Sequence, residues 1–417
     1  MPGEPAERLA IADWMTAPAT LAVMAALEAA GGEGAARFVG GCVRNMILGK
    51  AIDDIDIATQ LEPPQTMRAL EAAGLRCVPT GLEHGTVTAI VDGKPFEVTT
   101  LRRDVATDGR RAVVAFTRDW AEDAQRRDFR LNALYLDLLG GVYDPVGQGL
   151  ADARAGRIIF VGDPQQRIRE DYLRILRFFR FQAWYGRTTA DPEGLEACAE
   201  LKAGLSQLSA ERVSKELLKL LAADDPRESL GMMRQTGVLD AVLLGNVGLD
   251  QLDRLVEIER DILGAADGEL RLAALWPQDA AAAARESDRL RLSKAQRERL
   301  AAAVSPEPRI AADLATIPAR RIVYRLGAAA FSDRVKLAWA AQPSDASPEP
   351  WLALLAEART WSPPRFPLTG ADAAGAGFAA GPAMGAALRA AEAWWIEQDF
   401  QPDRVALIGR LSSQTPP

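Results

Sequence analysis

Hydrophobic and polar positions change their spacing partway along the chain. Between Arg37 and about Asp144, short apolar runs rich in β-branched residues are separated by turn signals. Examples are TVTAIV (Thr86–Val91) and FEVTTL (Phe96–Leu101), with the turn signal DGK (Asp92–Lys94) between them. Runs of this length and composition predict strands with a helix or two between them. We therefore expect an α/β or α+β domain in this region.

After Asp163 the pattern becomes helical almost to the end of the chain. Apolar residues recur at spacings of three and four, as in ERVSKELLKLLAA (Glu211–Ala223). Asp163 with Pro164 marks the start of one long helix, and Ser209 marks the start of another, because Asp and Ser cap helices and Pro is tolerated in the first turn. The second half is predicted to be all-α.

Two polar, proline-containing segments interrupt the helical half. QPSDASPEP (Gln342–Pro350) predicts a linker, and WSPPRFPLTG (Trp361–Gly370) predicts a turn-rich segment that leads into the last helices. With 417 residues, the chain is long enough for two to four domains.

Composition and charge limit the function classes. The chain is 48% hydrophobic and 25% charged, which is typical of a well-buried globular protein. Its formal net charge is -8, so it does not attract nucleic acid by overall positive charge. Any polyanionic partner must bind a local basic face.

Cysteine usage and the absence of targeting signals indicate a cytoplasmic protein. Cys42, Cys77 and Cys198 are far apart, which favours reduced thiols in the core over a disulfide framework or a zinc cluster. The N-terminus carries Glu4 and Glu7 instead of a basic region, and no uncharged apolar run reaches the roughly 18 residues of a membrane span. We expect no membrane association.

Closely spaced acids in DDIDIA are the first candidate site. Asp54 and Asp56 are two residues apart, so in a strand both side chains lie on one face, while Ile55 and Ile57 face the core. Two adjacent carboxylates repel each other unless a cation lies between them, and Mg²⁺ prefers such hard oxygen ligands. Asp53 falls on the opposite face and is a weaker candidate. A strand end with its acids in water is the alternative.

A candidate phosphate site precedes these acids. Gly40 and Gly41 follow an apolar pair and come before a predicted helix that starts near Val43. Their backbone amides could approach a phosphate at the helix N-terminus, with Arg44 as its counter-charge. A glycine turn that could bind phosphate, a few residues before two acids that could bind a metal ion, is a stronger indication of a nucleotide site than either feature alone.

An arginine stripe supplies the local basic face. Asp171, Arg174, Arg177 and Arg180 recur every third residue, which predicts one slowly drifting stripe on a helix. Between Gln165 and Arg187 there are six basic residues against two acidic ones. A solvated helix surface is the alternative, but a lone Asp at the head of three arginines favours a bound, partly polar ligand.

The order of these signals resembles the polymerase-β-type nucleotidyltransferases. The longer match is closest to the family of class II tRNA nucleotidyltransferases (CCA-adding enzymes) and bacterial poly(A) polymerases. Four further segments carry the resemblance, in the family's order: HGTVTAIVDGKPFEVTTLRRDV (His84–Val105), RRDFRLNALYLD (Arg126–Asp137), REDYLRILRFFRF (Arg169–Phe181) and LSAERVSKELLKLL (Leu208–Leu221).

The resemblance implies an α+β fold class: a polymerase-β-like nucleotidyltransferase head, with a mixed sheet and helices, followed by an all-α neck, body and tail. The expected division is 1–36, an N-terminal helical segment; 37–150, the head; 151–225, the nucleotide-reading neck; 226–342, the body; and 351–417, a tail that contacts tRNA.

Catalytic and metal-binding residues follow from the same resemblance. Glu97 aligns with the family's third metal carboxylate, so Asp54, Asp56 and Glu97 are expected to hold two Mg²⁺ ions. The substrates implied are CTP and ATP, and the partner is the 3′ end and acceptor arm of tRNA. No stable protein partner is predicted.

Nucleotide-reading residues are also implied. The resemblance gives base recognition to Asp171 and Arg174, and the triphosphate to Arg177 and Arg180. Asp offers only acceptors and suits the exocyclic amine of C or A, while Arg offers only donors. In a separate segment, Arg127 and Asp128 are expected to bind the sugar hydroxyls.

Some positions depart from the family pattern or add detail to it. Asn45 stands where the family more often has Asp, and Arg130 where it more often has Thr. RRDVATDGRRAVVAF (Arg102–Phe116) resembles the flexible loop of full CCA-adding enzymes, which favours addition of the terminal A. His84, the only histidine, is expected at a turn or strand start.

The carboxyl segment Phe366–Trp395 resembles the family's tail. Gly381 and Pro382 are predicted to open a helix that could face tRNA phosphate, and Trp394 and Trp395 are interpreted as packing residues instead of stacking platforms for bases.

These observations predict template-independent addition of CCA to tRNA from CTP and ATP, with release of pyrophosphate. The nearest alternative is a poly(A) polymerase of the same family, although the arginine-rich stretch of bacterial poly(A) polymerases is missing. A non-catalytic RNA-binding protein on a nucleotidyltransferase head, or an enzyme acting on a small molecule, fits the intact acids and the long helical half less well.

Overall fold

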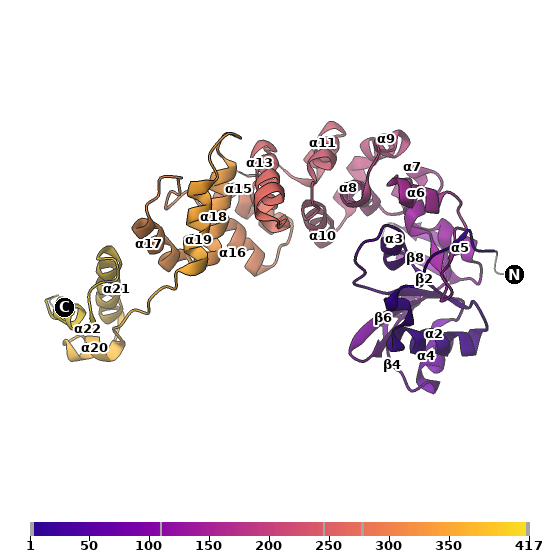
Figure 1. The fold of residues 1–417 in the computed structure, drawn as a ribbon, viewed down its shortest axis with the longest axis horizontal. Coiled ribbons are helices and arrows are strands. Elements are labelled where there is room, and N and C mark those ends of the chain that lie inside the picture. The colour runs from indigo at the N-terminus through magenta and orange to yellow at the C-terminus, as the bar shows by residue number, and fades with distance from the viewer. Residues whose placement is uncertain (1–3, 109–110, 245–246, 277–278, 414–417) are drawn as a thin grey trace. The chain divides into compact units, whose positions relative to one another are not determined.

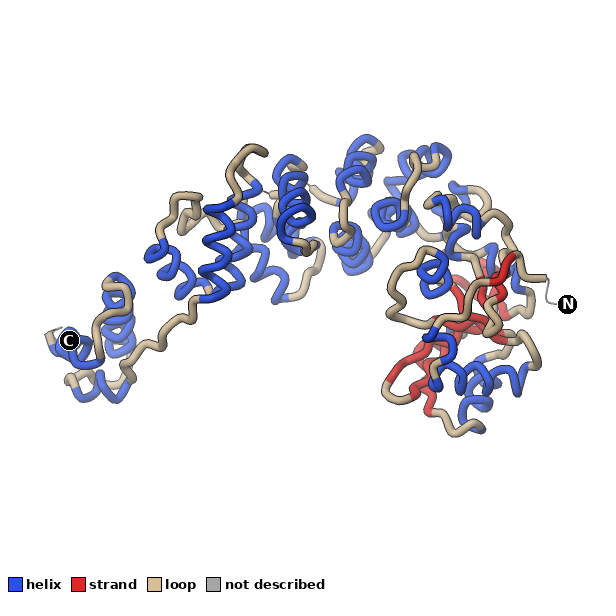
Figure 2. Tube along the Cα trace, viewed as in Figure 1, coloured by secondary structure: helices blue, strands red, loops and turns tan. Residues whose placement is uncertain are grey.

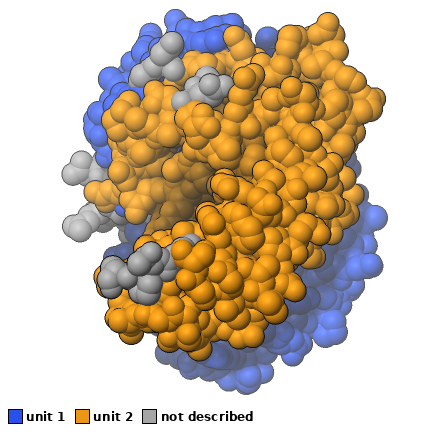
Figure 3. All heavy atoms as spheres, turned by 90° about the vertical axis from the view of Figure 1, so that its left-hand side faces the viewer, with its two compact units in different colours: residues 1–245 blue, residues 246–417 orange. Residues whose placement is uncertain are grey.

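The structure is a computed structural model that describes residues 4–108, 111–244, 247–276 and 279–413. The chain divides into two compact units, Met1–Gly245 and Asn246–Pro417 (Figure 3). The first unit holds every strand of the described residues, and the second is built from helices (Figure 2). This arrangement confirms the predicted fold class. The finer division into five segments stays a prediction.

A mixed sheet of eight strands forms the centre of the first unit, in the order β1-β10-β9-β2-β3-β6-β5-β4. All neighbouring strands are antiparallel except β3 and β6, which are parallel. β7 and β8 form a separate hairpin. The strands are β1 (Glu7–Arg8), β2 (Ala36–Val39), β3 (Asp56–Thr59), β4 (Arg76–Gly81), β5 (Thr86–Val91), β6 (Lys94–Thr100), β7 (Arg102–Asp108), β8 (Arg111–Phe116), β9 (Tyr135–Leu136) and β10 (Gly141–Tyr143).

The local signals for strands are borne out. TVTAIV is β5, and FEVTTL overlaps β6. The DGK turn between them has Asp92 at φ 51° and Gly93 at φ 76°, the left-handed region that Gly and Asp tolerate best. The hairpin of β7 and β8 occupies the segment interpreted as a flexible loop, and its residues 109–110 lie outside the described residues.

Short helices surround this sheet (Figure 1). α2 and α4 pack against each other and contact β2 and β4, while α3 follows β2 directly. The residues before the sheet also contain β1, which pairs with β10, so the amino-terminal segment contributes a strand as well as helices. The helices are α1 (Asp13–Thr16), α2 (Pro18–Gly31), α3 (Gly41–Ile47), α4 (Pro63–Ala72), α5 (Trp120–Gln125) and α6 (Gly149–Ala155), with 3₁₀ turns at Leu82–His84 and Arg130–Asn132.

The prediction of one long helix after Asp163 is wrong. Asp163 caps α7 and accepts a hydrogen bond from Gln166 N at 2.7 Å, but the helix ends at Glu170. Asp171 is extended, with φ -155° and ψ 105°, and its carboxylate accepts a hydrogen bond from Leu173 N at 3.1 Å. Such a local side-chain bond competes with helical hydrogen bonding, so α8 begins anew at Leu173.

In the rest of the first unit, α8 contacts α7, α10 and α11, while α9 packs on α7 and α12 packs on α11. They are α7 (Pro164–Glu170), α8 (Leu173–Tyr185), α9 (Pro192–Leu201), α10 (Ala210–Leu221), α11 (Arg227–Gln235) and α12 (Val238–Val242), with a 3₁₀ turn at Lys202–Gln207. Ser209 precedes α10 as predicted, although its hydroxyl makes no capping bond.

Buried phenylalanines join α8 to the sheet domain. Phe129 and Phe160 pair as an isolated β-bridge, and both contact Phe178 of α8. The rings of Phe160 and Phe178 stack with centroids 5.5 Å apart, and Phe181 adds a contact to Phe129 at 5.0 Å. Because all these side chains are almost fully buried, this core fixes α8 relative to the sheet.

The cysteines and the histidine lie close to expectation. Cys42 and Cys198 are buried and free, whereas Cys77 is half-buried instead of fully in the core. Burial raises the pKa of the Cys42 thiol to about 11, so it stays protonated. His84 ends the 3₁₀ turn immediately before β5.

The second unit contains helices α13 to α22. α19 begins at Glu349 and packs on α17 and α18, so the segment predicted as a linker is instead a loop within one helical group. The elements are α13 (Asp250–Ile258), a π-helical turn (Glu259–Leu263), α14 (Gly268–Ala273), α15 (Ala280–Arg289), α16 (Lys294–Ala303), α17 (Thr316–Leu326), α18 (Ala328–Ala340), α19 (Glu349–Thr360), α20 (Gly370–Gly375), α21 (Pro382–Glu397) and α22 (Arg404–Ser412). None of the helices in the described ranges has the length and apolar character needed to cross a membrane.

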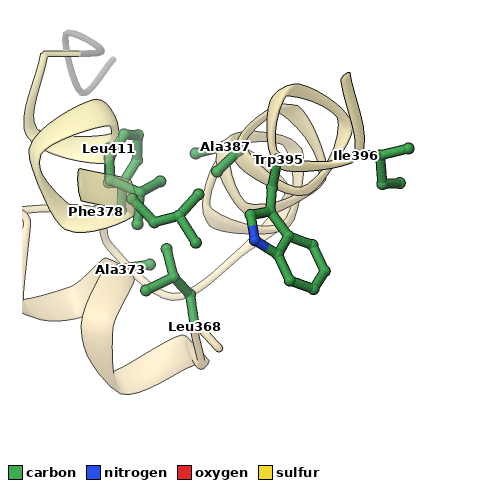
Figure 4. Packing of buried hydrophobic residues seen from close by; sticks show 9 residues of the cluster. Leu368, Ala373, Phe378, Ala387, Trp395, Ile396 and Leu411 are labelled. Carbon is green, nitrogen blue, oxygen red and sulfur yellow. The ribbon is translucent and has the colours of Figure 1, made fainter. Parts of the chain in front are cut away.

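A small hydrophobic core holds the last three helices together (Figure 4). Trp395 of α21 is 3% exposed, and its indole Nε1 donates to Pro402 O at 3.0 Å. Trp394 is only partly buried, with the Arg410 guanidinium 5.6 Å from its ring centroid. Both tryptophans therefore pack within the chain, as predicted, and α21 starts at Pro382 after Gly381.

We expect Trp395→Ala to open this last group of helices. Replacing a buried Trp with Ala lowers stability by about 3–5 kcal/mol, so the backbone amides of these helices should exchange at least about 100-fold faster. Hydrogen exchange of the α21 and α22 amides, followed by mass spectrometry, measures it. Trp394→Ala is the matched control and should change exchange much less. Equal exchange in the two variants would contradict the packing described.

Candidate active site

Parallel pairing of β3 with β6 brings two acids from distant parts of the sequence together. The register places Asp56 opposite Glu97, followed by Ile57 opposite Val98. Paired residues on adjacent strands project to the same side of a sheet. Asp56 and Glu97 therefore share one face, while Ile57 and Val98 are buried on the other.

Asp54 does not lie in the strand, in contrast to the prediction. The pairing of β3 starts at Asp56, so the residues before it have no strand pairing to order them. Asp54 is exposed, as is Asp53, and Ile55 is only half-buried. The charge of Asp54 nevertheless contributes to raising the pKa of Asp56, so the two acids lie in one neighbourhood.

The pKa of Asp56 reveals crowded negative charge. Burial, followed by repulsion from Glu97 and Asp54, raises the pKa of Asp56 to about 6, and Arg127 opposes this rise. Ionising Asp56 therefore costs free energy in the folded chain. A cation between these carboxylates would remove that cost.

The donor set fits a hard divalent cation. Within the described ranges, no group of three or more acidic, cysteine or histidine side chains closes around one point. Mg²⁺ does not need such a cage, because it usually keeps several waters and takes one or two carboxylates plus substrate phosphates. Asp56 with Glu97, and Asp54 nearby, match that requirement.

Gly40 lies directly beside Asp56. Its backbone has φ 72° and ψ -121°, which favours glycine, and Gly41 begins α3 two residues before the predicted start. A Cβ on Gly40 would lie 3.8 Å from Asp56 Oδ2 and 3.9 Å from Arg127 Nη1. The glycine turn, one acid and one arginine thus meet at a single place.

Arg44 is held by protein groups. Its Nη1 donates to Asn132 Oδ1 at 2.7 Å and its Nη2 to Tyr185 Oη at 2.8 Å, and Asn45 Oδ1 accepts two further bonds. The side chain is 7% exposed, and burial lowers the pKa of the guanidinium. Its predicted role as a phosphate counter-charge stays a prediction.

Arg127 and Asp128 have different partners although they are adjacent. Arg127 Nη2 donates to Asp123 Oδ2 at 2.9 Å and its Nε to Tyr135 Oη at 3.4 Å. Asp128 accepts two bonds from Arg177, one of them at 2.7 Å. Burial alone would raise the pKa of Asp128, but the charge of Arg177, together with hydrogen bonds from Arg177, Asn132 and the Phe129 amide, lowers it to about 2.

The predicted base readers also carry partners. Asp171 Oδ2 accepts from Arg212 Nη2 at 2.7 Å. Arg174 donates to Glu170 Oε2 at 2.6 Å and to two backbone carbonyl oxygens, those of Arg167 at 2.9 Å and of Arg126 at 3.0 Å. A guanidinium has five N–H donors and a carboxylate about four lone pairs, so these bonds orient both groups without using all their capacity.

Glu216 of α10 joins the other two arginines of the stripe. Its Oε2 accepts from Arg180 Nε at 2.6 Å, and its Oε1 lies 3.9 Å from Arg177 Nη1. Only Arg174, Arg177 and Arg180 lie on α8, because Asp171 occupies the break before it.

Sequence reasoning missed several residues of this network. Their positions in quoted motifs were available signals: Asn132 is in RRDFRLNALYLD, and Arg212 and Glu216 are in LSAERVSKELLKLL. Asp123 lies four residues before Arg127, a spacing that pairs side chains on a helix. Tyr135 also lies in RRDFRLNALYLD and Glu170 in REDYLRILRFFRF, whereas Tyr185 lies outside the quoted motifs.

Comparisons with known proteins show which family the chain belongs to. The family described as "Poly A polymerase head domain" matches residues 36–159, and "Probable RNA and SrmB- binding site of polymerase A" matches residues 189–245. The mitochondrial CCA tRNA nucleotidyltransferase 1 of Mus musculus is 33% identical over 393 residues, which cover 90% of this chain and 86% of that protein. The chain belongs to the CCA tRNA nucleotidyltransferase family.

Other members of the CCA tRNA nucleotidyltransferase family match as well. The CCA-adding enzyme of Levilactobacillus brevis is 41% identical over 240 residues, covering 57% of each chain. The crystal structure of the Bacillus stearothermophilus CCA-adding enzyme in complex with CTP matches with a TM-score of 0.74 and 25% identity, over 95% of this chain and 97% of that one.

We expect Asp56→Asn to stabilise the protein in the absence of metal. The folded pKa of Asp56, about 6, lies above its ordinary value of 3.8, so its contribution to stability is lost as pH rises from about 4 through 6. At pH 7.5 in EDTA, the free energy of unfolding of the variant should exceed that of the wild type by on the order of 1 kcal/mol, and by at most about 3 kcal/mol.

Urea unfolding of the variant and the wild type between pH 4 and 7.5 measures this difference. The difference should shrink as the pH falls toward 4, where Asp56 is protonated in the folded protein and partly protonated in the unfolded chain. Asp53→Asn, an exposed neighbour, is the control. A variant less stable than the wild type at pH 7.5 would contradict the crowding of charge.

Proposed function

We propose that this protein adds CCA to the 3′ end of tRNA from CTP and ATP, without a nucleic-acid template and with release of pyrophosphate. The observation that carries the proposal is the register of Asp56 with Glu97 beside the glycine turn at Gly40. Membership of the CCA tRNA nucleotidyltransferase family supports this substrate.

Asp56 and Glu97, with Asp54 nearby, would hold up to two Mg²⁺ ions. When bound, Mg²⁺ lowers the pKa of the RNA 3′ hydroxyl and neutralises charge on the attacking and leaving oxygens. The carboxylates fix where that chemistry occurs, and no histidine base is required. Gly40 and Gly41 leave room for a phosphate to approach the backbone at the start of α3.

Asp171 and Arg174 would select the base. C and A each present an amine donor and a ring acceptor, which match an acceptor-only Asp and a donor-only Arg. U and G present the reverse pattern at the corresponding edge. The bond that Arg212 donates to Asp171 and the bond that Arg174 donates to Glu170 would hold the two side chains in place before the nucleotide enters.

Arginines of α8 would hold the triphosphate, and Arg127 with Asp128 the sugar. Arg177 and Arg180 are already balanced by Asp128 and Glu216, so a bound triphosphate would share these arginines with the protein carboxylates. This arrangement keeps positive charge in place in a protein whose total charge is negative.

The helical second unit would grip tRNA by shape and phosphate contacts, including those at Gly381 and Pro382. The hairpin of β7 and β8 supports addition of the terminal A by its resemblance to the family's loop. We also propose a cytoplasmic location and no stable protein partner, although some relatives are mitochondrial.

The deciding experiment offers the protein and Mg²⁺ a tRNA that lacks CCA and an A-tailed model RNA. CTP and ATP are supplied separately and together, and the 3′ ends are sequenced. CCA ends restricted to tRNA support the proposal. Long A tails on any RNA would establish the alternative, a poly(A) polymerase of the same fold.

Asp54→Ala should lower nucleotide addition by at least about 1,000-fold, because a metal ligand contributes several kcal/mol to the transition state. Initial rates at saturating CTP and ATP measure it. Asp53→Ala, the adjacent exposed acid, is the matched control and should keep near wild-type rates. Full activity in Asp54→Ala would rule out the assigned metal site.

Asp171→Ala should weaken the choice of base more than the rate of transfer. Losing one side of a two-sided base contact costs about 1–3 kcal/mol, so selectivity for CTP and ATP over UTP and GTP should fall about 10- to 100-fold. Single-nucleotide incorporation with each of the four triphosphates measures the ratio. An unchanged ratio would show that another group reads the base.

A further inference from the structure

Asp123 is a buried acid of α5 to which the proposed chemistry gives no role. It is 1% exposed, and its carboxylate accepts five hydrogen bonds. Oδ1 accepts from Arg102 N at 3.1 Å and from Arg126 Nε and Nη2 at 2.9 and 2.8 Å. Oδ2 accepts from Arg127 Nη2 at 2.9 Å and Tyr135 Oη at 2.7 Å. All of its acceptor capacity is in use.

One oxygen of this carboxylate, Oδ2, binds Arg127. The guanidinium of Arg127 lies beside two acids: it pairs with Asp123, and its Nη1 lies at the same glycine, Gly40, as Asp56 Oδ2. Its charge also acts on Asp56. Asp123 and Tyr135 both bind Arg127, so the ion pair that the guanidinium forms is with Asp123 and not with Asp56.

The other oxygen, Oδ1, binds the residue at which the hairpin begins. Arg102 is the first residue of β7, and its N–H donates to Asp123 while its carbonyl accepts from Arg126 Nε at 3.1 Å. Both backbone polar groups of Arg102 are thus held by the same acid and its arginine partner. Where the chain leaves the sheet for the hairpin, it is tied to the residue that orients Arg127.

We propose that Asp123 is a positioning residue that keeps Arg127 from neutralising Asp56 and ties the hairpin of β7 and β8 to that same point. Without Asp123, Arg127 pairs with Asp56 and competes with the divalent cation, and the base of the hairpin loosens. The inference rests on the proposed function for its metal readout, and on the fold alone for its hairpin readout.

The test compares Asp123→Asn with the wild-type protein in two assays. An Asn side chain is uncharged and places N–H donors where Asp123 accepts. The Mg²⁺ concentration for half-maximal nucleotide addition should rise about 10- to 100-fold, as is typical when support for a metal ligand is lost. Trypsin cleavage within residues 102–116, measured without substrate by mass spectrometry, should accelerate by at least about fivefold as the local opening becomes more favourable.

Two further variants separate positioning from general damage. Glu122→Gln removes a charge from the same helix, where Glu122 accepts from Thr117 Oγ1 at 2.5 Å, and it should leave the Mg²⁺ requirement unchanged. Tyr135→Phe removes one bond to Asp123 and one to Arg127 while keeping both charges. It should raise the Mg²⁺ requirement in the same direction by a smaller factor, which keeps the test available if Asp123→Asn does not fold.

The outcomes distinguish this inference from the proposed function. An unchanged Mg²⁺ requirement in both Asp123→Asn and Tyr135→Phe, with wild-type CCA addition intact, overturns the positioning role alone. A wild-type protein that adds no nucleotide overturns the proposed function, and the trypsin assay still decides the tie to the hairpin. Cleavage at the wild-type rate in folded Asp123→Asn overturns that tie.

Discussion

The parallel pairing of β3 with β6 is the constraint on which the site depends. It is the single parallel pair among the described strands, and its register sets which side chains meet across about forty residues of sequence. A slip of one residue would turn Asp56 toward the core and Ile57 toward the glycine turn. The buried partners Ile57 and Val98 oppose such a slip, so hydrophobic packing on one face fixes the chemistry on the other.

Ion pairs organise the rest of the site. Asp128, Glu170 and Glu216 each bind an arginine of α8, and Arg212 binds Asp171. Buried or half-buried arginines without partners would be costly and mobile. The carboxylates therefore keep the arginines oriented and balance their charge.

Much of the fold was predictable from local sequence, and much of the network was not. Strands β5 and β6, the start of α7 at Pro164 and the glycine turn before α3 follow from spacing and caps within a few residues. The position of Asp54 before the strand and the break at Asp171 depend on where pairing starts and on one side-chain bond. Partners such as Glu216, 36 residues from Arg180, depend on packing between helices that no local pattern encodes.

The break at Asp171 has a consequence for how base preference is built. Asp171 is supported from α10 through Arg212, whereas Arg174 is supported from α7 through Glu170. Asp171 lies in the break and Arg174 lies in α8, so the proposed acceptor half and donor half of the recognition set are anchored to different helices. Under the proposed function, base preference is therefore modular: each half is open to change by substitutions in its own supporting helix, so evolution or design can alter them in separate steps.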